Sequence, residues 1–511
     1  MKKLLLYIAL FFFAMPACFC QNWNFLYGGS EENWCRDVIE TYDHGYVFVG
    51  PHDGQYSSID IKKIDINGNI LWQKIIGISS DKILPVVIIE TLDKGFLIAG
   101  LEAKYDPPPV GGNSFAMKLN ECGEAEWCKS YGTYGTYDYI TKAVQTDDKG
   151  FAMIAAGIDN NNVVLLKTDS IGRLEFKKHY HDTSNTSVWS LIKCMNGDLI
   201  LSGDGYFQNP GGVPAGWWER GIVTRVDKNG NEKWTHILGL DTLLFSATTY
   251  CAELPDSSII CGTTWRSQSN GSVTKPYIFE LNKNGALQWR RFVGDTAWFD
   301  SDVAGIVQTD TNKVFLLSGR YCDPVYHGVF LYRTDTCGIF QDSAWYDYDH
   351  YCWVGNLKTT SDHKLIYCGT QDNGGNYQAQ IIRFREDLSI DTVLNIQLTY
   401  DSLCGHAIPA IEYLPFDTSY HIGIKPKVVV NEEPFLFPNP NIGSYYVRIP
   451  FMPGENARLE VYDFSGRVLY NQNVPMGGGV IEVNMPDAAP GVYLCRVMYK
   501  GEVHSLKFVI N

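Results

Sequence analysis

A short pattern that recurs about every fifty residues limits this chain to a repeat architecture. In most copies an alternating strand ends in Asp or Asn, a Gly follows three residues later, and an aromatic residue stands at the seventh position. The aromatic positions are Trp23, Trp72, Trp127, Phe176, Trp234 and Trp289, with a degenerate seventh copy near Ser343. A period of this length indicates repeated supersecondary units that pack against one another.

A second type of hairpin lies between these marks. It contains short runs of β-branched or aromatic residues bounded by Asp, Asn and Gly, for example residues 45–50 and 95–100. Such runs are typical of strands joined by tight turns, so each repeat supplies four antiparallel strands. Four-stranded units at this period are the blades of β-propellers. The sequence therefore predicts an all-β chain with a seven-bladed β-propeller over residues 21–400.

The strand count also predicts how the ring closes. Seven sets of the first three strands run from about Trp34 to Arg385, but eight segments could serve as a fourth strand. One of the eight is surplus, and the two that compete for the last place are residues 23–27, before the first set, and residues 392–398, after the last. Because Trp23 and Gly28 keep the repeat marks, we expect the N-terminal segment to complete the seventh blade.

Composition excludes several classes of partner. The 511 residues are 45% hydrophobic and 14% aromatic, which excludes disorder for most of the chain. The formal net charge is −15, from 42 Lys and Arg against 57 Asp and Glu. Nucleic acids and anionic membranes require a basic surface, so neither is expected as a partner. No stretch of the mature chain is apolar enough to predict a transmembrane helix.

The N-terminus has the order of charges and apolar residues that is typical of a secretory signal. Lys2 and Lys3 precede an apolar run, and small residues continue to Cys20. We expect residues 1–20 to be removed as a signal peptide; acylation at Cys18 or Cys20 is the alternative. An exported chain can oxidise its remaining cysteines. Cys251 and Cys261 lie symmetrically in one hairpin, where they form either a cross-strand disulfide or two buried thiols.

The last 78 residues, 434–511, differ from the repeats, and residues 401–433 are interpreted as a connector. The module resembles the type A sorting domain of the type IX secretion system of Bacteroidetes. The residues that carry the resemblance include Pro438, Asn439, Pro440, Gly466, Gly491, Tyr493 and Lys507. The resemblance implies a small immunoglobulin-like β-sandwich, Sec export, and recognition by the outer-membrane secretion machinery. It also implies removal of the domain and a final location outside the cell or on its surface.

The propeller hairpins resemble those of quinoprotein-type and other secreted propellers, but the marks of their enzymes are missing. The chain has no adjacent Cys pair of the kind common in quinoproteins, and the sialidase turn places Trp five residues after Asp, not seven. We therefore assign no catalytic residue and expect no cofactor and no metal. A secreted propeller enzyme, such as a glycoside hydrolase, is the alternative to a binding scaffold.

The candidate ligand-binding residues are aromatic. Two sets of turns in each repeat are short and uniform, whereas the connections at the opposite face vary in length, and repeat proteins bind ligands on their variable side. The longest insertion, residues 204–220, places Trp217 and Trp218 in a loop rich in Gly and Pro. Together with Trp265 and Tyr105, these side chains are predicted to bind a glycan or a surface protein. In the alternative interpretation, the two Trp side chains fold back and cap the blade.

Overall fold

The computed structural model describes most of the chain between residues 21 and 510, and within that part its regular secondary structure is strand. The described ranges are 21–28, 32–52, 58–77, 81–104, 112–132, 138–157, 163–180, 186–208, 217–238, 245–266, 274–294, 302–309, 312–320, 327–348, 352–372, 376–393, 395–396, 398, 400, 411–413, 434–437, 443–449, 457–474, 479–485, 488–499 and 502–510. The predicted signal peptide lies outside these residues.

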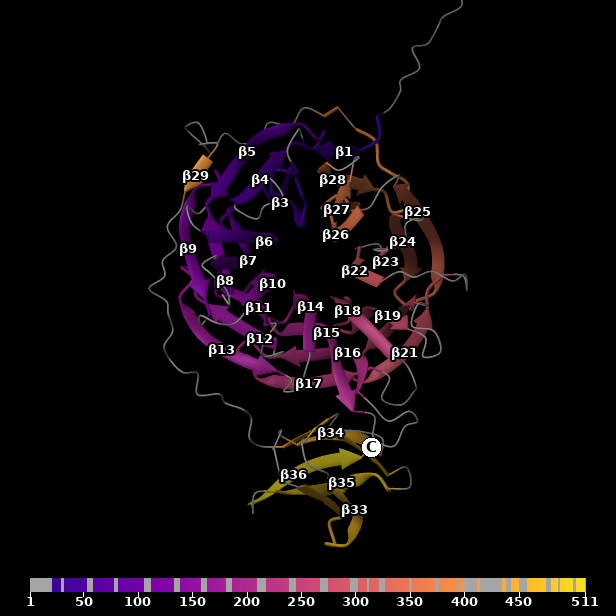
Figure 1. Ribbon diagram of the computed structural model, residues 1–511. Coiled ribbons are helices and arrows are strands. Elements are labelled where there is room, and N and C mark those ends of the chain that lie inside the picture. Colours follow the sequence, from indigo (N-terminus) through magenta and orange to yellow (C-terminus); the bar gives the residue numbers. More distant parts are fainter. Residues whose placement is uncertain are drawn as a thin grey trace, which may run out of the picture.

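Seven antiparallel sheets form a ring around a central axis, as the sequence predicts (Figure 1). Numbered along the chain, blades 1 to 7 each contribute one strand to each of four concentric positions. The innermost strands are β2 (Asp37–Glu40), β6 (Asp81–Glu90), β10 (Asp138–Gln145), β14 (Thr186–Lys193), β18 (Phe245–Glu253), β22 (Asp302–Gln308) and β26 (Cys352–Thr359). The second strands are β3 (Tyr46–Pro51), β7 (Phe96–Lys104), β11 (Phe151–Gly157), β15 (Leu199–Gln208), β19 (Ile259–Arg266), β23 (Lys313–Arg320) and β27 (Leu365–Asp372).

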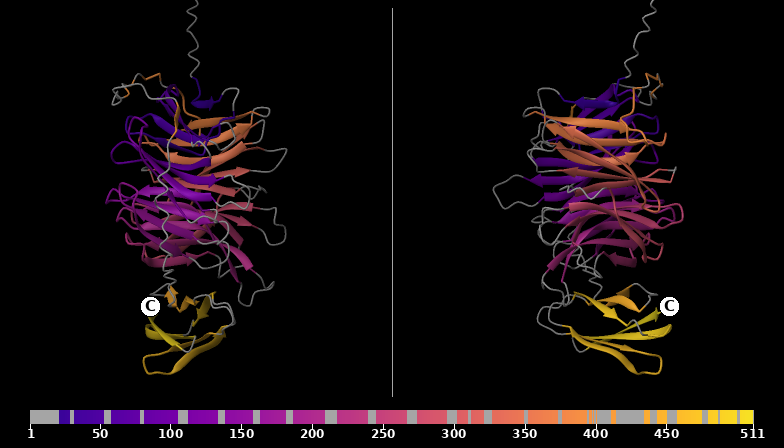
Figure 2. Two further views of the ribbon diagram at one scale, coloured as in Figure 1. Left: turned by 60° about the vertical axis from the view of Figure 1, so that its left-hand side comes forward. Right: turned by 90° about the vertical axis from the view of Figure 1, so that its right-hand side faces the viewer.

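The outer half of each blade contains the third and fourth strands. The third strands are β4 (Ser58–Ile64), β8 (Gly112–Leu119), β12 (Val163–Thr168), β16 (Trp217–Val226), β20 (Thr274–Leu281), β24 (His327–Asp335) and β28 (Tyr377–Phe384). The fourth strands are β5 (Ile70–Gly77), β9 (Ala125–Tyr131), β13 (Leu174–Tyr180), β17 (Glu232–Ile237), β21 (Leu287–Phe292), β25 (Phe340–Tyr348) and β1 (Asn24–Tyr27). The side views show the strands running across the thickness of the disk (Figure 2).

The N-terminal strand closes the ring, which confirms the prediction. β1 pairs antiparallel with β28 from Asn24 opposite Ile382 to Tyr27 opposite Ala379. The described residues of the competing segment, 392–398, form no strand; they contain an isolated bridge between Thr392 and Asn22 and a bond from the Val393 N–H to the Gln21 carbonyl. Blade 7 therefore combines three strands from the end of the propeller sequence with one from its beginning.

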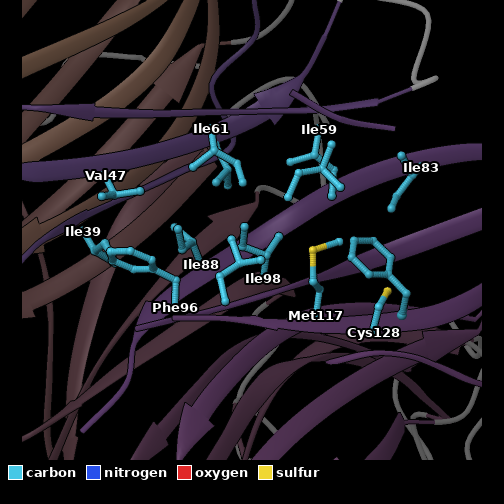
Figure 3. Close-up of a cluster of buried hydrophobic side chains, with 14 residues drawn as sticks. Ile39, Val47, Ile59, Ile61, Ile83, Ile88, Phe96, Ile98, Met117 and Cys128 are labelled. Atoms are coloured by element: carbon cyan, nitrogen blue, oxygen red, sulfur yellow. The ribbon is translucent and has the colours of Figure 1, made fainter. Parts of the chain in front are cut away.

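Hydrophobic side chains fill the space between neighbouring blades. Figure 3 shows the cluster between blades 1 and 2, where Ile59 and Ile61 of β4 lie opposite Ile98 of β7 and Met117 of β8. All four are buried, with at most 1% of their surface exposed. Burial of this apolar area is the main favourable contribution to blade packing.

The repeated aromatic residue packs on the turn glycine of the next blade. Gly285, at the turn between β20 and β21, has a φ of 82°, and a Cβ at this position would come within 2.6 Å of the Trp234 ring of blade 4. Glycine is required for both reasons. The Trp234 indole also donates a hydrogen bond of 3.0 Å to the carbonyl of Lys283 in that turn. Equivalent bonds join Trp23 to Ile66 and Trp127 to Ser170.

A second outer contact strengthens the same junctions. A Tyr stands four residues after the aromatic position. Its hydroxyl donates a hydrogen bond to a backbone carbonyl in the next blade, in the turn that follows the third strand. The bonds are Tyr27 to Gly68 (2.8 Å), Tyr131 to Gly172 (2.7 Å), Tyr180 to Gly230 (2.6 Å) and Tyr346 to Leu388. Burial raises the pKa of Tyr27, so its phenol remains a donor. In blade 1 the buried ammonium of Lys74 makes the corresponding bond to Gly123.

An inner set of bonds joins the blades near the axis. In several blades the last residue of the innermost strand is a Glu or Gln. Its side-chain oxygen accepts a hydrogen bond from a backbone N–H in the preceding blade, in the turn between the first two strands. These bonds are Tyr42 N–H to Glu90 (2.8 Å), Leu92 N–H to Gln145 (2.7 Å), Met195 N–H to Glu253 (2.6 Å) and Ser361 N–H to Glu40 (2.5 Å). The inner and outer bonds both involve the short, uniform turns. The face of the disk that carries these turns therefore stabilises the ring.

An ion pair connects the two short turns within most blades. Near the end of the third strand a buried basic residue reaches the Asp of the turn between the first two strands, as Lys167 does with Asp148 at 2.8 Å. The equivalent pairs are Lys63 with Asp43, Lys118 with Asp93, Arg225 with Asp198 and Arg383 with Asp362. Blade 6 differs: the carboxylate of Glu386 from blade 7 pairs with Lys313 at the start of the second strand and accepts a hydrogen bond from Thr309, while Arg333 of the third strand donates to the Glu386 carbonyl.

These pairs predict acid sensitivity. Burial tends to raise the pKa of Asp148, but hydrogen bonds from Lys167, Thr146 and the Gly150 N–H outweigh it and lower the pKa to about 2. Because the unfolded value is roughly 3.9, the stabilisation is complete above about pH 5 and is lost as the pH falls towards 2. We expect Asp148→Asn to lower the free energy of unfolding at pH 7 by about 1 kcal/mol or less, since the carboxylate is half-exposed.

Urea unfolding at pH 7 and pH 2.5 measures this effect. The difference between wild type and Asp148→Asn should shrink at the lower pH, and a difference independent of pH would contradict the assignment. Asp147→Asn controls for the loss of one negative charge in the same turn, where Asp147 is more exposed and pairs with Lys193.

The C-terminal module is a two-layer β-sandwich, in agreement with the prediction. One sheet contains β30 (Phe435–Phe437), β31 (Ser444–Ile449) and β34 (Gly479–Asn484); the other contains β33 (Val468–Val474), β32 (Ala457–Tyr462), β35 (Gly491–Tyr499) and β36 (Glu502–Ile510). Its core has fully buried residues from both layers, including Tyr445, Leu459, Val483, Cys495 and Phe508. Within the predicted connector, β29 (Ile411–Tyr413) pairs parallel with β5 and adds a fifth strand to blade 1.

Candidate ligand-binding site

The two faces of the propeller present different chemistry. The short-turn face uses its turn backbone and acidic side chains in the inner and outer bonds described above. The opposite face carries the variable connections, and several of these, such as residues 105–111, 209–216 and 267–273, lie outside the described part of the chain. The described residues that border this face are the ends of the strands, and the candidate site is built from them.

Trp217 and Trp218 lie in a strand and not in a loop, which corrects the sequence-based expectation. Both residues begin β16, where Trp217 stands opposite Gln208 and Trp218 opposite Phe207 of β15. The ten-residue pairing of β15 with β16 satisfies backbone groups that a loop would leave to water. The neighbouring Gly and Pro residues hid this strand pattern from sequence reasoning.

Trp265 packs on its own blade. It lies in β19, half-buried, with its ring edge-on to Phe292 at 5.6 Å between ring centroids. Phe292 contacts Tyr277 in turn, at 5.1 Å. The Trp265 indole N–H is buried and has no hydrogen-bond partner among the described residues. The structure thus joins Trp265 to Phe292 and Tyr277, while Tyr105 lies outside the described residues.

An axial cluster of charged residues was not anticipated from the sequence. Asp37 is fully buried at the start of β2 and accepts bonds from the Val38 and Ile88 N–H groups at 2.9 and 3.0 Å. The Lys358 ammonium lies 2.8 Å from the same carboxylate, and the Asn356 amide donates to it at 3.1 Å. Asp37 therefore links blades 7, 1 and 2, and its two oxygens are occupied by these donors.

Lys142 is the second charged group of this cluster. Its ammonium lies 6.0 Å from the centroid of the Tyr250 ring, which belongs to blade 5. Burial lowers the pKa of Lys142; attraction by Asp37 opposes this effect, and repulsion by Lys358 adds to it. Among the described residues Lys142 has no hydrogen-bond or ion-pair partner. The available sequence signal was a charged residue within an apolar innermost strand, which the repeat marks do not highlight.

The innermost strands also contain bulges. The pairing of the first with the second strand shifts register in blades 2 to 7, for example between Ile140 and Lys142 of β10. Bulges of this kind redirect side chains and are common next to active sites.

In the described part of the chain, no three His, Cys, Asp or Glu side chains are grouped to hold a metal ion. The described residues contain no apolar helix long enough to cross a membrane.

Solved structures with similar architecture share little sequence with this chain. A protein of unknown function from Dyadobacter fermentans is 12% identical, with 58% of this chain and 93% of that chain covered and a TM-score of 0.41. The polysaccharide lyase Uly1 is 9% identical (71% and 92% covered, TM-score 0.43). An α-L-arabinanase from Penicillium chrysogenum is 10% identical (58% and 92% covered, TM-score 0.37). No curated protein sequence matches the chain.

The C-terminal module matches a family model, and its signature residues occupy structural positions. Gly466 has a φ of 85° in the turn between β32 and β33, and Gly491 begins β35. Tyr493 stacks on Phe508 at 5.5 Å, and Lys507 stands opposite Leu494 in the β35–β36 pair. Pro438, Asn439 and Pro440 lie outside the described residues. Residues 435–511 match the family described as "Secretion system C-terminal sorting domain", so the chain is a cargo protein that type IX secretion exports to the cell surface or the extracellular space.

Proposed function

We propose that the exported propeller is a binding scaffold whose ligand, a glycan or a surface protein, contacts the face with the variable connections at blades 4 and 5. The main supporting observation is the extended β15–β16 hairpin, which carries two adjacent Trp residues at the start of β16. The opposite face, by contrast, uses its turns to hold the blades together. A rigid ring with one adaptable face is a common arrangement for recognition.

The chemistry of the neighbouring residues fits this role. Trp and Tyr offer large planar surfaces that stack on sugar rings and dominate many protein interfaces. Tyr206, opposite Glu219 in the same hairpin, is 36% exposed, and Phe292 in the next blade is 50% exposed. Because these aromatic residues lie on paired strands, little conformational entropy is lost when a ligand binds.

A secreted glycoside hydrolase remains the alternative function. That chemistry needs two carboxyl groups on either side of the scissile bond. Asp37, the buried axial carboxylate, is saturated by Lys358, Asn356 and two backbone donors and so supplies neither role. The alternative therefore depends on carboxyl groups from elsewhere in the chain.

A glycan and surface-protein array distinguishes the two functions. We expect wild type to bind a ligand and Trp217→Ala/Trp218→Ala to bind it at least about tenfold more weakly, as for hot-spot aromatic residues. Phe464→Ala, which removes a 95% exposed aromatic ring from the sorting domain, serves as the matched control and should bind normally. Unchanged binding by the double variant would remove this hairpin as the site, and turnover in a parallel glycosidase screen would favour the hydrolase.

A further inference from the structure

Two cysteines from opposite ends of the propeller sequence meet where the ring closes. Cys35 precedes β2 of blade 1, and Cys368 lies in β27 of blade 7. Both are completely buried, in the same hydrophobic cluster as Trp23 and Tyr27 of the closing strand. Their thiols are in hydrogen-bonding contact.

The surrounding backbone holds the two sulfur atoms in place. The Cys35 N–H donates to the Thr370 hydroxyl at 3.1 Å, and that hydroxyl lies 3.4 Å from the Cys35 carbonyl. The Asn356 N–H points at the Cys368 sulfur, at 3.4 Å. Both cysteines are thus fixed by contacts to blade 7, and no rearrangement of the blades is needed to bring them together.

We propose that Cys35 and Cys368 form a disulfide in the exported protein, which joins the two ends of the propeller covalently. Cys122 is disulfide-bonded in the same structure, and disulfides persist in proteins that are exported to an oxidising environment. Export by type IX secretion is consistent with this environment.

The reaction is a thiol–disulfide exchange with a disulfide oxidant, either a protein disulfide or a small-molecule disulfide. One cysteine thiolate attacks a sulfur of the oxidant and releases a first thiol, and the second cysteine attacks the mixed disulfide and releases another. The cysteine pair loses two electrons, and its two protons end on the two thiols that the oxidant becomes. Burial raises the pKa of the Cys35 thiol well above its usual value and so disfavours the thiolate. The first attack therefore takes place while this thiol is exposed to solvent, and the second follows when ring closure brings Cys368 beside it.

The other thiol pair provides a contrast. Cys251 and Cys261 stand opposite each other in the β18–β19 hairpin, with their sulfur atoms 2.8 Å apart. A bond there would close a very short loop, whereas the Cys35–Cys368 bond encloses nearly the whole propeller. Loop-closure entropy makes the second bond the more stabilising of the two.

Mass spectrometry of the full-length protein, secreted by its host and alkylated without reductant, tests the proposal directly. We expect a peptide pair linked through Cys35 and Cys368, which disappears on reduction. Recovery of both cysteines as alkylated thiols would overturn the proposal. This measurement uses the wild-type protein and is independent of whether any variant folds.

Thermal unfolding provides a second test. Reductant should lower the melting temperature of wild type by on the order of 5 °C more than that of Cys35→Ala/Cys368→Ala, in which the Cys122 disulfide is still reduced. Cys251→Ala/Cys261→Ala is the matched control and should keep most of the wild-type response. An equal response to reductant in wild type and in the Cys35→Ala/Cys368→Ala variant would contradict a stabilising bond at the closure.

Discussion

Deletion of residues 21–29 is expected to destabilise the propeller by more than any single substitution in its strands. The deletion removes β1, exposes the edge of β28, and leaves an unpaired strand that can associate with other molecules. It also removes the fully buried Trp23, and loss of a buried Trp side chain alone costs about 3–5 kcal/mol. Scanning fluorimetry and light scattering should show a melting temperature lowered by at least about 5 °C, together with aggregation.

Deletion of residues 392–398 is the matched control. This segment contributes the Thr392 bridge and hydrogen bonds between Ile396 and Asn67, but no strand of a blade. Its removal should lower the melting temperature less and leave the protein soluble. The reverse order of effects would show that the C-terminal segment closes the ring.

Removal of residues 434–511 is expected to abolish export while the propeller still folds. The sorting domain has its own core, centred on Tyr445, Val461 and Phe508. Its Tyr446 packs on the small Phe207–Ile222–Ile237 cluster of blade 4, so loss of the domain exposes that cluster but leaves the larger cores between the blades in place. In a type IX-secreting Bacteroidetes host, the truncated chain should be at least about a hundredfold depleted from the medium and cell surface. Immunoblotting of cell fractions, with protease treatment of intact cells, provides the measurement.

Phe464→Ala in the full-length chain controls for a general disturbance of the domain. Its side chain is 95% exposed, so the β-sandwich should fold and export should continue. Equal amounts of truncated and full-length protein outside the cell would show that the signal lies elsewhere. Retention of a misfolded propeller, detected by protease sensitivity of the cell extract, would show that the domain is needed for folding.

Much of the fold could be predicted because its sequence marks are local. Asp, Gly and the aromatic residue at fixed spacing form a turn and the side chain that packs on the next such turn, as Gly285 and Trp234 show. The seventh blade has weaker marks, yet the surplus strand at Trp23 identified the closure correctly. These features depend on turn chemistry and on one repeated contact, both of which remain visible in a single sequence.

The inner bonds and the axial cluster could not be predicted because their partners come from different blades. A Glu or Gln at a strand end, such as Glu90, looks like any solvent-exposed residue until the turn of the preceding blade lies beside it. Glu386 reaches Lys313 of blade 6 only because blade 7 lies next to it. Asp37 and Lys358 meet for the same reason, through closure of the ring.

The candidate ligand site shows a different limit. The Gly- and Pro-rich segment before Trp217 and Trp218 indicated a loop where the structure has a strand. Cross-strand pairing with β15 decides their conformation, and such pairing is set by the whole hairpin and not by local composition. Trp265 illustrates the same point, because its contact with Phe292 comes from the fourth strand of the blade.

The arrangement of the outer bonds has a consequence for how such a gene can change in length. Most repeats carry an aromatic residue that fits the following blade and a glycine turn that receives the preceding one, as in Trp127 and Gly123 of blade 2. Unequal recombination that inserts or removes one whole repeat therefore restores a complete junction at the new boundary, without any compensating substitution. Blade number can vary among descendants of such a gene, while an insertion of half a repeat would leave one aromatic residue and one turn without their counterparts.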